Sequence, residues 1–339
     1  MPGTIETPEF KNFTAHALHP TFAAEIKGVD WKNVTDETLS EIQDAVHKYG
    51  VCVFRDTGLD DTAHVEFSRR LGELDDVKRY MVGGRKLRYQ YYELFDAGNL
   101  DAENNLLDPD SPRAHANRGN ELFHADSTFN PRRASYSLLR AVLLPPKGTG
   151  GNTDFADVRT AYAELPEAVR SELEANDYVG AHTFAQSRKL GSPVFFSHLD
   201  PTAFKMARHK LLQTHHESGR KTLVIGAHLH HIEGLPPEKS DALRDYLRDF
   251  VTQEKYRISV EWERPGDMII WDNRCTLHRA AGGSFQGKYK RDLRRTTVHD
   301  SGEAAWGLNP VGESFGSFAV DMRKESEKGE APAAKGAAA

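Results

Sequence analysis

Short apolar stretches separated by turns recur along the chain from residue 135 onward, and they limit the folds open to it. Each has the alternating or continuously apolar pattern of a strand, and they lie at residues 135–144, 223–226, 256–262, 268–272 and 294–298. Helices are predicted between them at 158–165, 167–174 and 236–252. Many short strands with a few helices outside them are typical of a sandwich or jelly roll. We therefore predict a mainly β fold with flanking helices.

The N-terminal part of the chain predicts two helices around one buried strand. Thr35 or Asp36 can cap the first helix, and Gly50 ends it. A buried strand is predicted over 51–54, and a second helix over 59–71. We expect this block to be a supporting layer rather than a site.

The chain has 339 residues, which allows two domains, but its pattern favours one. We expect a flexible N-terminal arm over residues 1–12, a single folded domain over 13–322 and a disordered tail over 323–339. Within the domain, the segment at about 79–120 starts with basic and tyrosine residues and continues as a long polar loop. Loops of this length inside a compact domain are usually functional, so we predict a lid over a site.

Composition excludes several classes of function. The net charge of −6 argues against a nucleic-acid binder, which would present a basic face. No run approaches the roughly 18 apolar residues of a membrane span, and the N-terminus has no apolar core of a secretory signal. The two cysteines, Cys52 and Cys275, predict buried thiols rather than a disulfide framework. We expect a cytoplasmic protein that acts on small molecules.

His124 and Asp126 point to a specific chemistry. Their neighbours predict a strand over 123–128. Alternate residues of a strand face the same side, so the imidazole and the carboxylate would point to one place. They would supply two thirds of the 2-His-1-carboxylate triad, which holds Fe(II) and leaves positions for a co-substrate and O2. The best third ligand is His278, which lies 154 residues downstream of His124.

Arginines follow the third ligand. Arg291 and Arg295 are four residues apart, and in a strand they would share a face and point into one cavity. A guanidinium grips a carboxylate through two parallel hydrogen bonds, so it can anchor the far end of a 2-oxo acid bound to the metal. Thr153 can add a hydroxyl bond. By itself, the basic cluster at 288–295 is more typical of a solvated edge.

Six segments then occur in a characteristic order, and together they resemble the TauD/TfdA family of Fe(II)/2-oxoglutarate-dependent dioxygenases. The similarity covers roughly residues 18–300 and is nearest to the TfdA branch, whose best-known members cleave 2,4-dichlorophenoxyacetate. The segments are His124-Ala125-Asp126, the Gly150–Asp157 stretch, Gly219-Arg220-Lys221, Ile225-Gly226-Ala227-His228, the Trp271–Arg279 stretch and Arg291-Asp292-Leu293-Arg294-Arg295.

The resemblance implies a double-stranded β-helix, which is a jelly roll, with Fe(II) as cofactor and 2-oxoglutarate and O2 as co-substrates. It implies His124, Asp126 and His278 as the iron ligands. Arg291 and Thr153 would match the residues that grip the distal carboxylate of 2-oxoglutarate. Arg295 would match an arginine near the oxo-acid head and the anionic group of the substrate.

The substrate implied by the resemblance is a small carboxylate-bearing acid, such as an aryloxyacid, an amino acid or a secondary-metabolite intermediate. A C–H bond of this acid would be oxidised with release of succinate and CO2. Asn120 matches a position that touches the substrate in some relatives. Gln90 stands where the herbicide-cleaving relatives carry lysine, and a replacement cation is expected from Arg79, Arg85 or Arg88. Relatives are commonly dimers or larger, which implies a homo-oligomer.

Two other functions remain compatible with the ligand residues alone. Zinc also binds histidine and aspartate, which would give a zinc-dependent hydrolase. A jelly-roll binding protein with a vestigial metal site is the non-catalytic alternative. Neither needs an anion clamp beside the metal, so Arg291 and Arg295 favour the dioxygenase.

Overall fold

The structure is a computed structural model that describes residues 9–78 and 87–315. Several expectations fall outside this part of the chain: those for residues 1–8, for the tail over 323–339, and for Arg79 and Arg85.

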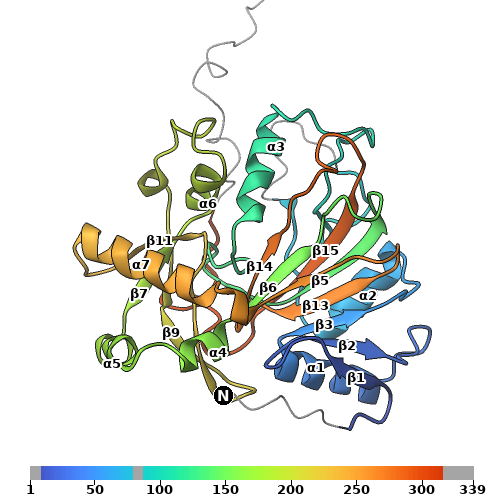
Figure 1. Ribbon diagram of the computed structural model, residues 1–339, viewed down its shortest axis with the longest axis horizontal. Coiled ribbons are helices and arrows are strands. Elements are labelled where there is room, and N and C mark those ends of the chain that lie inside the picture. The colour runs from blue at the N-terminus through green and yellow to red at the C-terminus, as the bar shows by residue number, and fades with distance from the viewer. Residues whose placement is uncertain (1–8, 79–86, 316–339) are drawn as a thin grey trace, which may run out of the picture.

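The centre of the molecule is a seven-stranded sheet that faces a three-stranded sheet (Figure 1). The larger sheet has the order β1-β2-β3-β13-β5-β15-β4. Its strands are β1 (Thr14–Ala17), β2 (Ala24–Lys27), β3 (Val51–Phe54), β4 (Phe95–Asp96), β5 (Ala134–Leu143), β13 (Met268–Asp272) and β15 (Asp292–His299). The smaller sheet has the order β12-β6-β14 and comprises β6 (Thr153–Asp157), β12 (Arg257–Val260) and β14 (Thr276–Ala280).

Alternation along β13 shows how the two layers are held together. Ile269 and Trp271 lie in the core between the two sheets. Met268 and Ile270 point the other way, into the core under the N-terminal helices. The ring of Trp271 meets the ring of Phe155, on β6, edge-on at 5.5 Å between centroids. Both faces of this strand are buried, which explains why its sequence is continuously apolar.

Two helices cover the outer face of the larger sheet, as the sequence predicted. They are α1 (Asp36–Tyr49) and α2 (Asp61–Leu71). The Thr35 hydroxyl accepts a hydrogen bond from the Thr38 amide at 3.1 Å and caps α1. Gly50 ends the helix with a φ of 72°, a conformation that suits glycine.

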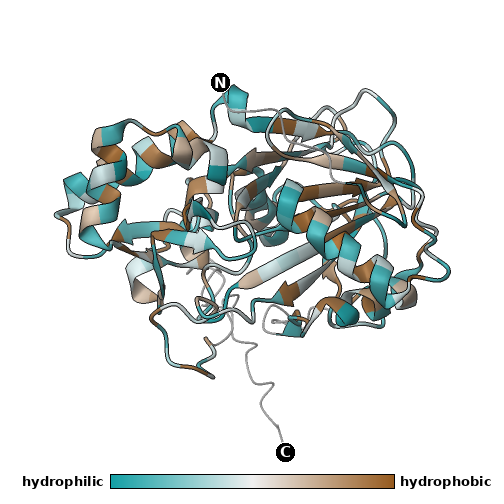
Figure 2. Ribbon diagram, turned by 90° about the horizontal axis from the view of Figure 1, so that it is seen from below, coloured by the Kyte–Doolittle hydropathy of each residue, from teal (hydrophilic) through white to brown (hydrophobic). Residues whose placement is uncertain are grey.

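A second helical layer lies on the opposite side of the molecule (Figure 1). Figure 2 shows that polar and apolar residues alternate along its helices, as expected for elements half exposed to solvent. The helices are α4 (Val158–Ala163), α5 (Glu167–Asn176), α6 (Phe184–Gly191) and α7 (Pro237–Val251), and the accompanying strands are β7 (Val179–His182), β8 (Ala207–Lys210), β9 (Leu212–His215), β10 (Arg220–Leu223) and β11 (Leu229–Ile232).

The described part of the predicted lid, residues 87–120, is not an unbroken loop. It contains β4 and a helix, α3 (Pro112–Asn117), followed by a 3-10 turn at Arg118–Glu121. Ser111 caps α3, since its hydroxyl accepts from the Ala114 amide at 3.2 Å, and Pro112 occupies the first helical position. This Ser-Pro start is a helix signal inside an otherwise polar stretch.

Both cysteines are buried, as predicted. Within residues 9–78 and 87–315, no helix has the length and apolarity of a membrane span.

Candidate active site

His124 and His278 are joined by their main chains. The His124 amide donates to the His278 carbonyl at 3.0 Å, and the His278 amide donates back to the His124 carbonyl at 2.8 Å. The predicted strand over 123–128 is wrong beyond this bridge, because the chain turns at residues 126–129 and Ser127 has a φ of 59°. The direction of the Asp126 carboxylate is therefore set by a turn, not by strand alternation.

The turn nevertheless brings the three predicted ligands together. One ligand atom from each of His124, Asp126 and His278 lies within 4.8 Å of the other two, and all three side chains are buried. The Nε2 atoms of His124 and His278 lie 3.9 Å and 3.6 Å from the Asp126 carboxylate oxygens. The Nδ1 of His124 donates to the Leu122 carbonyl at 2.7 Å, which leaves its Nε2 lone pair for a metal.

The protonation of these groups suits a divalent cation. Burial lowers the pKa of His124 to about 4, and it places the pKa of His278 well below its ordinary value. Burial opposes ionisation of Asp126 as well, but the positive charge of Arg295 and the hydrogen bond from Ser137 favour it, and the pKa of the carboxyl lies below its usual range. Two neutral imidazoles and one carboxylate are the donor set that Fe(II) takes in facial-triad sites.

A buried network fixes the orientation of the carboxylate. The Ser137 hydroxyl donates to Asp126 Oδ2 at 2.7 Å, and the Asp126 amide donates to Asn273 Oδ1 at 3.0 Å. Asn273 in turn accepts from the Trp271 indole at 3.0 Å and donates to the Ser137 hydroxyl at 2.9 Å. Sequence reasoning assigned no role to Ser137 or Asn273. The position of Asn273 directly after the Trp271-Asp272 strand end was a signal, whereas nothing in the sequence distinguished Ser137.

A cavity of about 140 Å³ lies on one side of the triad and contains the predicted co-substrate residues. Thr153, Arg291 and Arg295 all line it, together with His124 and His278. The Arg291 guanidinium is buried and donates to the carbonyls of Gly151, at 2.9 Å, and Ala97, at 3.2 Å. Burial lowers its pKa to about 10. The Arg295 guanidinium donates to Asp126 at 2.8 Å.

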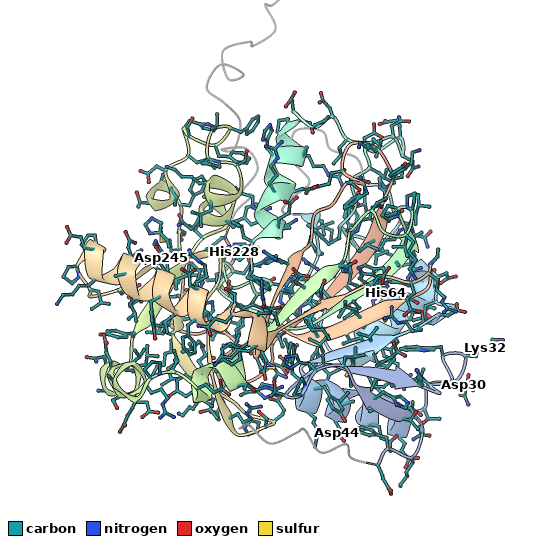
Figure 3. The ribbon with its side chains drawn as sticks, in the orientation of Figure 1. Asp30, Lys32, Asp44, His64, His228 and Asp245 are labelled. Carbon is teal, nitrogen blue, oxygen red and sulfur yellow. The ribbon has the colours of Figure 1, made fainter. Side chains whose placement is uncertain are left out.

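A second cavity, of about 50 Å³, lies on the other side and shares His124 and Arg295 with the first. One part of its wall is aromatic, where the rings of Phe129 and Phe184 lie 4.7 Å and 6.2 Å from the imidazole of His228, and another part carries the carboxylates of Asp75, Asp76 and Glu93. His228 lies in the interior, beside Phe184 of α6 (Figure 3). Nothing in the sequence marks Phe184, or Arg188, which comes from α6 and also lines this cavity.

The predicted substrate residues are distributed unevenly. Asn120 lines both cavities. Arg88 does not line either one, because its guanidinium is paired with Asp96 at 3.0 Å and Asp292 at 2.8 Å. Gln90 is exposed and lies away from both cavities. The structure therefore brings Asn120 and Arg295 to the site and leaves Arg88 and Gln90 out of it.

Comparisons with known proteins agree with this geometry. Residues 14–297 match the family described as "Taurine catabolism dioxygenase TauD, TfdA family". The alpha-ketoglutarate-dependent 2,4-dichlorophenoxyacetate dioxygenase of Cupriavidus pinatubonensis is 36% identical over 289 residues, which cover 84% of this chain and 97% of that protein. The (S)-phenoxypropionate/alpha-ketoglutarate-dioxygenase of Sphingobium herbicidovorans is 31% identical over 275 residues, covering 79% and 89%.

Solved structures show the same relationship. The crystal structure of AAD-2 in complex with Mn(II) and N-oxalylglycine superposes with a TM-score of 0.78 at 32% identity, covering 88% of this chain and 99% of that one. The jelly-roll fold and the reaction class expected from the sequence are thus confirmed, and a zinc hydrolase or a non-catalytic binding protein is set aside. The chain belongs to the TauD/TfdA family and is an iron- and 2-oxoglutarate-dependent dioxygenase.

Proposed function

We propose that this enzyme oxidises a C–H bond of a small organic acid with an apolar or aromatic body, and that aryloxyalkanoic acids are the first candidates. The larger cavity receives 2-oxoglutarate, and the smaller one receives the acid. The dioxygenases of Cupriavidus and Sphingobium named above support this substrate class, and so do the aromatic rings of Phe129 and Phe184 in the smaller cavity.

The observation that carries the proposal is the state of Arg291. Its guanidinium is buried, yet its hydrogen bonds go to the neutral carbonyls of Gly151 and Ala97, and no carboxylate in the described part of the chain is paired with it. A buried charge of this kind is costly unless a partner compensates it. The distal carboxylate of 2-oxoglutarate is such a partner, and the Thr153 hydroxyl on the same wall can donate to it.

Each residue then has a defined task. When bound, Fe(II) supplies the activation of O2 by which 2-oxoglutarate is decarboxylated to succinate and the substrate C–H bond is oxidised. His124, Asp126 and His278 would hold it. Arg295 lines both cavities, so it can face the carboxylate of the acid and the head of 2-oxoglutarate. The aromatic wall excludes water from the bond that is oxidised.

The test begins with an anaerobic titration of Fe(II) and 2-oxoglutarate, which is expected to give the visible band of the ternary complex. A panel of aryloxyacetates, aryloxypropionates, amino acids and alkyl sulfates is then screened for perturbation of that band and for succinate formation. Asp126→Ala should abolish substrate-dependent succinate, whereas Asp30→Asn, on the surface (Figure 3), should not change it. Undiminished turnover in Asp126→Ala would contradict the assignment of the ligand.

The homo-oligomeric state, the cytoplasmic location and the absence of a nucleic-acid partner stay predictions from the sequence.

A further inference from the structure

A glycine contact brings α6 unusually close to the turn that precedes the metal ligands. A Cβ placed on Gly191, the last residue of α6, would lie 2.5 Å from the backbone nitrogen of Gly119. A Cβ on Gly119 would lie 2.8 Å from the guanidinium of Arg188. Only glycine at both positions permits this approach. The consequence is that Arg188 reaches across to the turn that carries Asn120.

Arg188 is tightly held in this position. Its side chain is buried, its guanidinium lies over the ring of Phe184 at 4.1 Å, and it donates to the Ala116 carbonyl and the Ser187 hydroxyl. A further hydrogen bond runs from Nη2 to Asn120 Oδ1 at 2.9 Å. The positive charge of Arg188 also contributes to lowering the pKa of His124, so its field reaches the metal ligands.

The hydrogen bond to Asn120 determines which way that carboxamide faces. A guanidinium can only donate, so the oxygen of Asn120 must lie toward Arg188 and the NH2 group must lie away from it. Asn120 lines both the co-substrate cavity and the substrate cavity. An amide donor at this boundary is suited to an oxygen atom of an acid held in the smaller cavity.

We propose that Arg188 is a positioning residue, which turns the amide donor of Asn120 toward the acid substrate. The inference deepens the proposed function, on which it rests. It predicts that Arg188 and Asn120 act as one unit: without the guanidinium the carboxamide rotates freely, and its donor is no longer available at a fixed place.

Four variants test this unit. Arg188→Met removes the donor at similar length, and Arg188→Lys keeps a donor. Asn120→Asp keeps the acceptor that faces Arg188 but removes the amide donor. Arg118→Met is the matched control, because Arg118 lies on the same turn, is exposed and lines neither cavity. For each variant, the Michaelis constant is measured for the acid of the panel that binds best and for 2-oxoglutarate. The amount of succinate formed per molecule of acid oxidised is measured as well.

Arg188→Met and Asn120→Asp should each raise the Michaelis constant for the acid about 10- to 100-fold, the range for a lost charge-assisted or substrate hydrogen bond. Succinate formation should become partly uncoupled from substrate oxidation, the constant for 2-oxoglutarate should change little, and Arg188→Lys should recover part of the loss. The double variant should raise the Michaelis constant for the acid no more than the more damaging single substitution does. The effects of substituting residues that act as a unit are not additive.

Two results would overturn the inference: additive losses in the double variant, and an Asn120→Asp enzyme with normal affinity for the acid. Failure of the proposed function is distinguishable, because in that case no acid of the panel would bind the loaded wild-type protein. A merely structural role for Arg188 would lower the thermal midpoint and damage binding of both the acid and 2-oxoglutarate, without recovery in Arg188→Lys.

Discussion

The Ser137 hydroxyl lies 2.7 Å from Asp126 Oδ2 and donates to it, so one oxygen of the metal-binding carboxylate is already engaged. The hydrogen bond restricts rotation of the carboxylate, whose Oδ1 is paired with the Arg295 guanidinium at 2.8 Å and whose Oδ2 also lies 3.6 Å from Nε2 of His278. Orientation of a ligand by an outer partner is a common means of tuning metal affinity.

Ser137→Ala should therefore weaken Fe(II) binding about 10- to 100-fold, the usual cost of removing such a partner. Direct metal titration of the metal-free protein measures this without any turnover. Ser135→Ala is the control, because Ser135 lies two residues earlier on β5 and its hydroxyl donates to the carbonyls of Val298 and His299 rather than to a metal ligand. Equal metal affinities in the two variants would show that Ser137 does not orient the ligand.

Arg291→Gln should raise the Michaelis constant for 2-oxoglutarate about 100-fold, because truncating one partner of a buried charge pair costs several kcal/mol. Metal affinity in the absence of 2-oxoglutarate should not change, since Arg291 is not in contact with the triad. The control is Arg294→Gln, whose guanidinium points away from the cavity and pairs with Asp61 and Asp292. A normal constant for 2-oxoglutarate in Arg291→Gln would remove this arginine from the co-substrate site.

Gly191→Ala should destabilise the protein by about 1–3 kcal/mol, because the added methyl group must displace the backbone of Gly119 and overpacked sites cost this much. Unfolding in urea measures the change. Gly302→Ala is the comparison, since the nearest atom to a Cβ there is an Asp300 side-chain oxygen at 3.3 Å. Equal free energies of unfolding for the two variants would mean that α6 can shift away from Gly119 without a loss of stability.

Acidification should destabilise the metal-free protein. Burial lowers the pKa of His64 to about 3 and that of His209 to about 4, whereas both titrate near 6.5 when the chain is unfolded. Below about pH 6.5 the unfolded chain binds more protons than the folded one, so stability falls as the pH falls from there toward the folded-state pKa values.

The thermal midpoint of the wild type should therefore decrease as the pH is lowered from about 7 to about 5. The midpoint of His64→Gln should decrease less steeply over the same range. His64 lies between α2 and the larger sheet (Figure 3), where its Nε2 contacts the Thr296 hydroxyl at 3.2 Å. His16→Gln, at an exposed position, should follow the wild-type curve. The same slope in both variants would exclude His64 as a source of the pH dependence.

Local signals predicted much of the fold. The predicted caps and apolar spacing place α1 correctly, including its end at Gly50, and continuous apolarity correctly predicts β13 as a buried strand. Such features depend on neighbours along the chain, which a sequence displays directly. The strand predicted at 123–128 failed because the turn after Ala125 is stabilised by distant groups, above all Asn273, which accepts from the Asp126 amide.

The site was predictable where a residue type alone carries the chemistry. Few histidines, aspartates and arginines were suitably placed to be metal ligands or carboxylate anchors. The order of the motifs then indicated the family, which implied the role of each residue. Arg88 was a plausible substrate cation until its ion pairs with Asp96 and Asp292 were seen, because a sequence does not show which charges neutralise each other. Arg188 and Ser137 were missed for the converse reason: their importance depends on contacts across the fold.

The two metal-binding histidines are tied through main-chain hydrogen bonds, which replacement of a side chain does not remove. The spacing between the two positions therefore belongs to the scaffold and not to the imidazoles. During evolution, a chain built in this way can exchange one coordinating residue for another, and so alter its reactivity, without first dismantling its architecture.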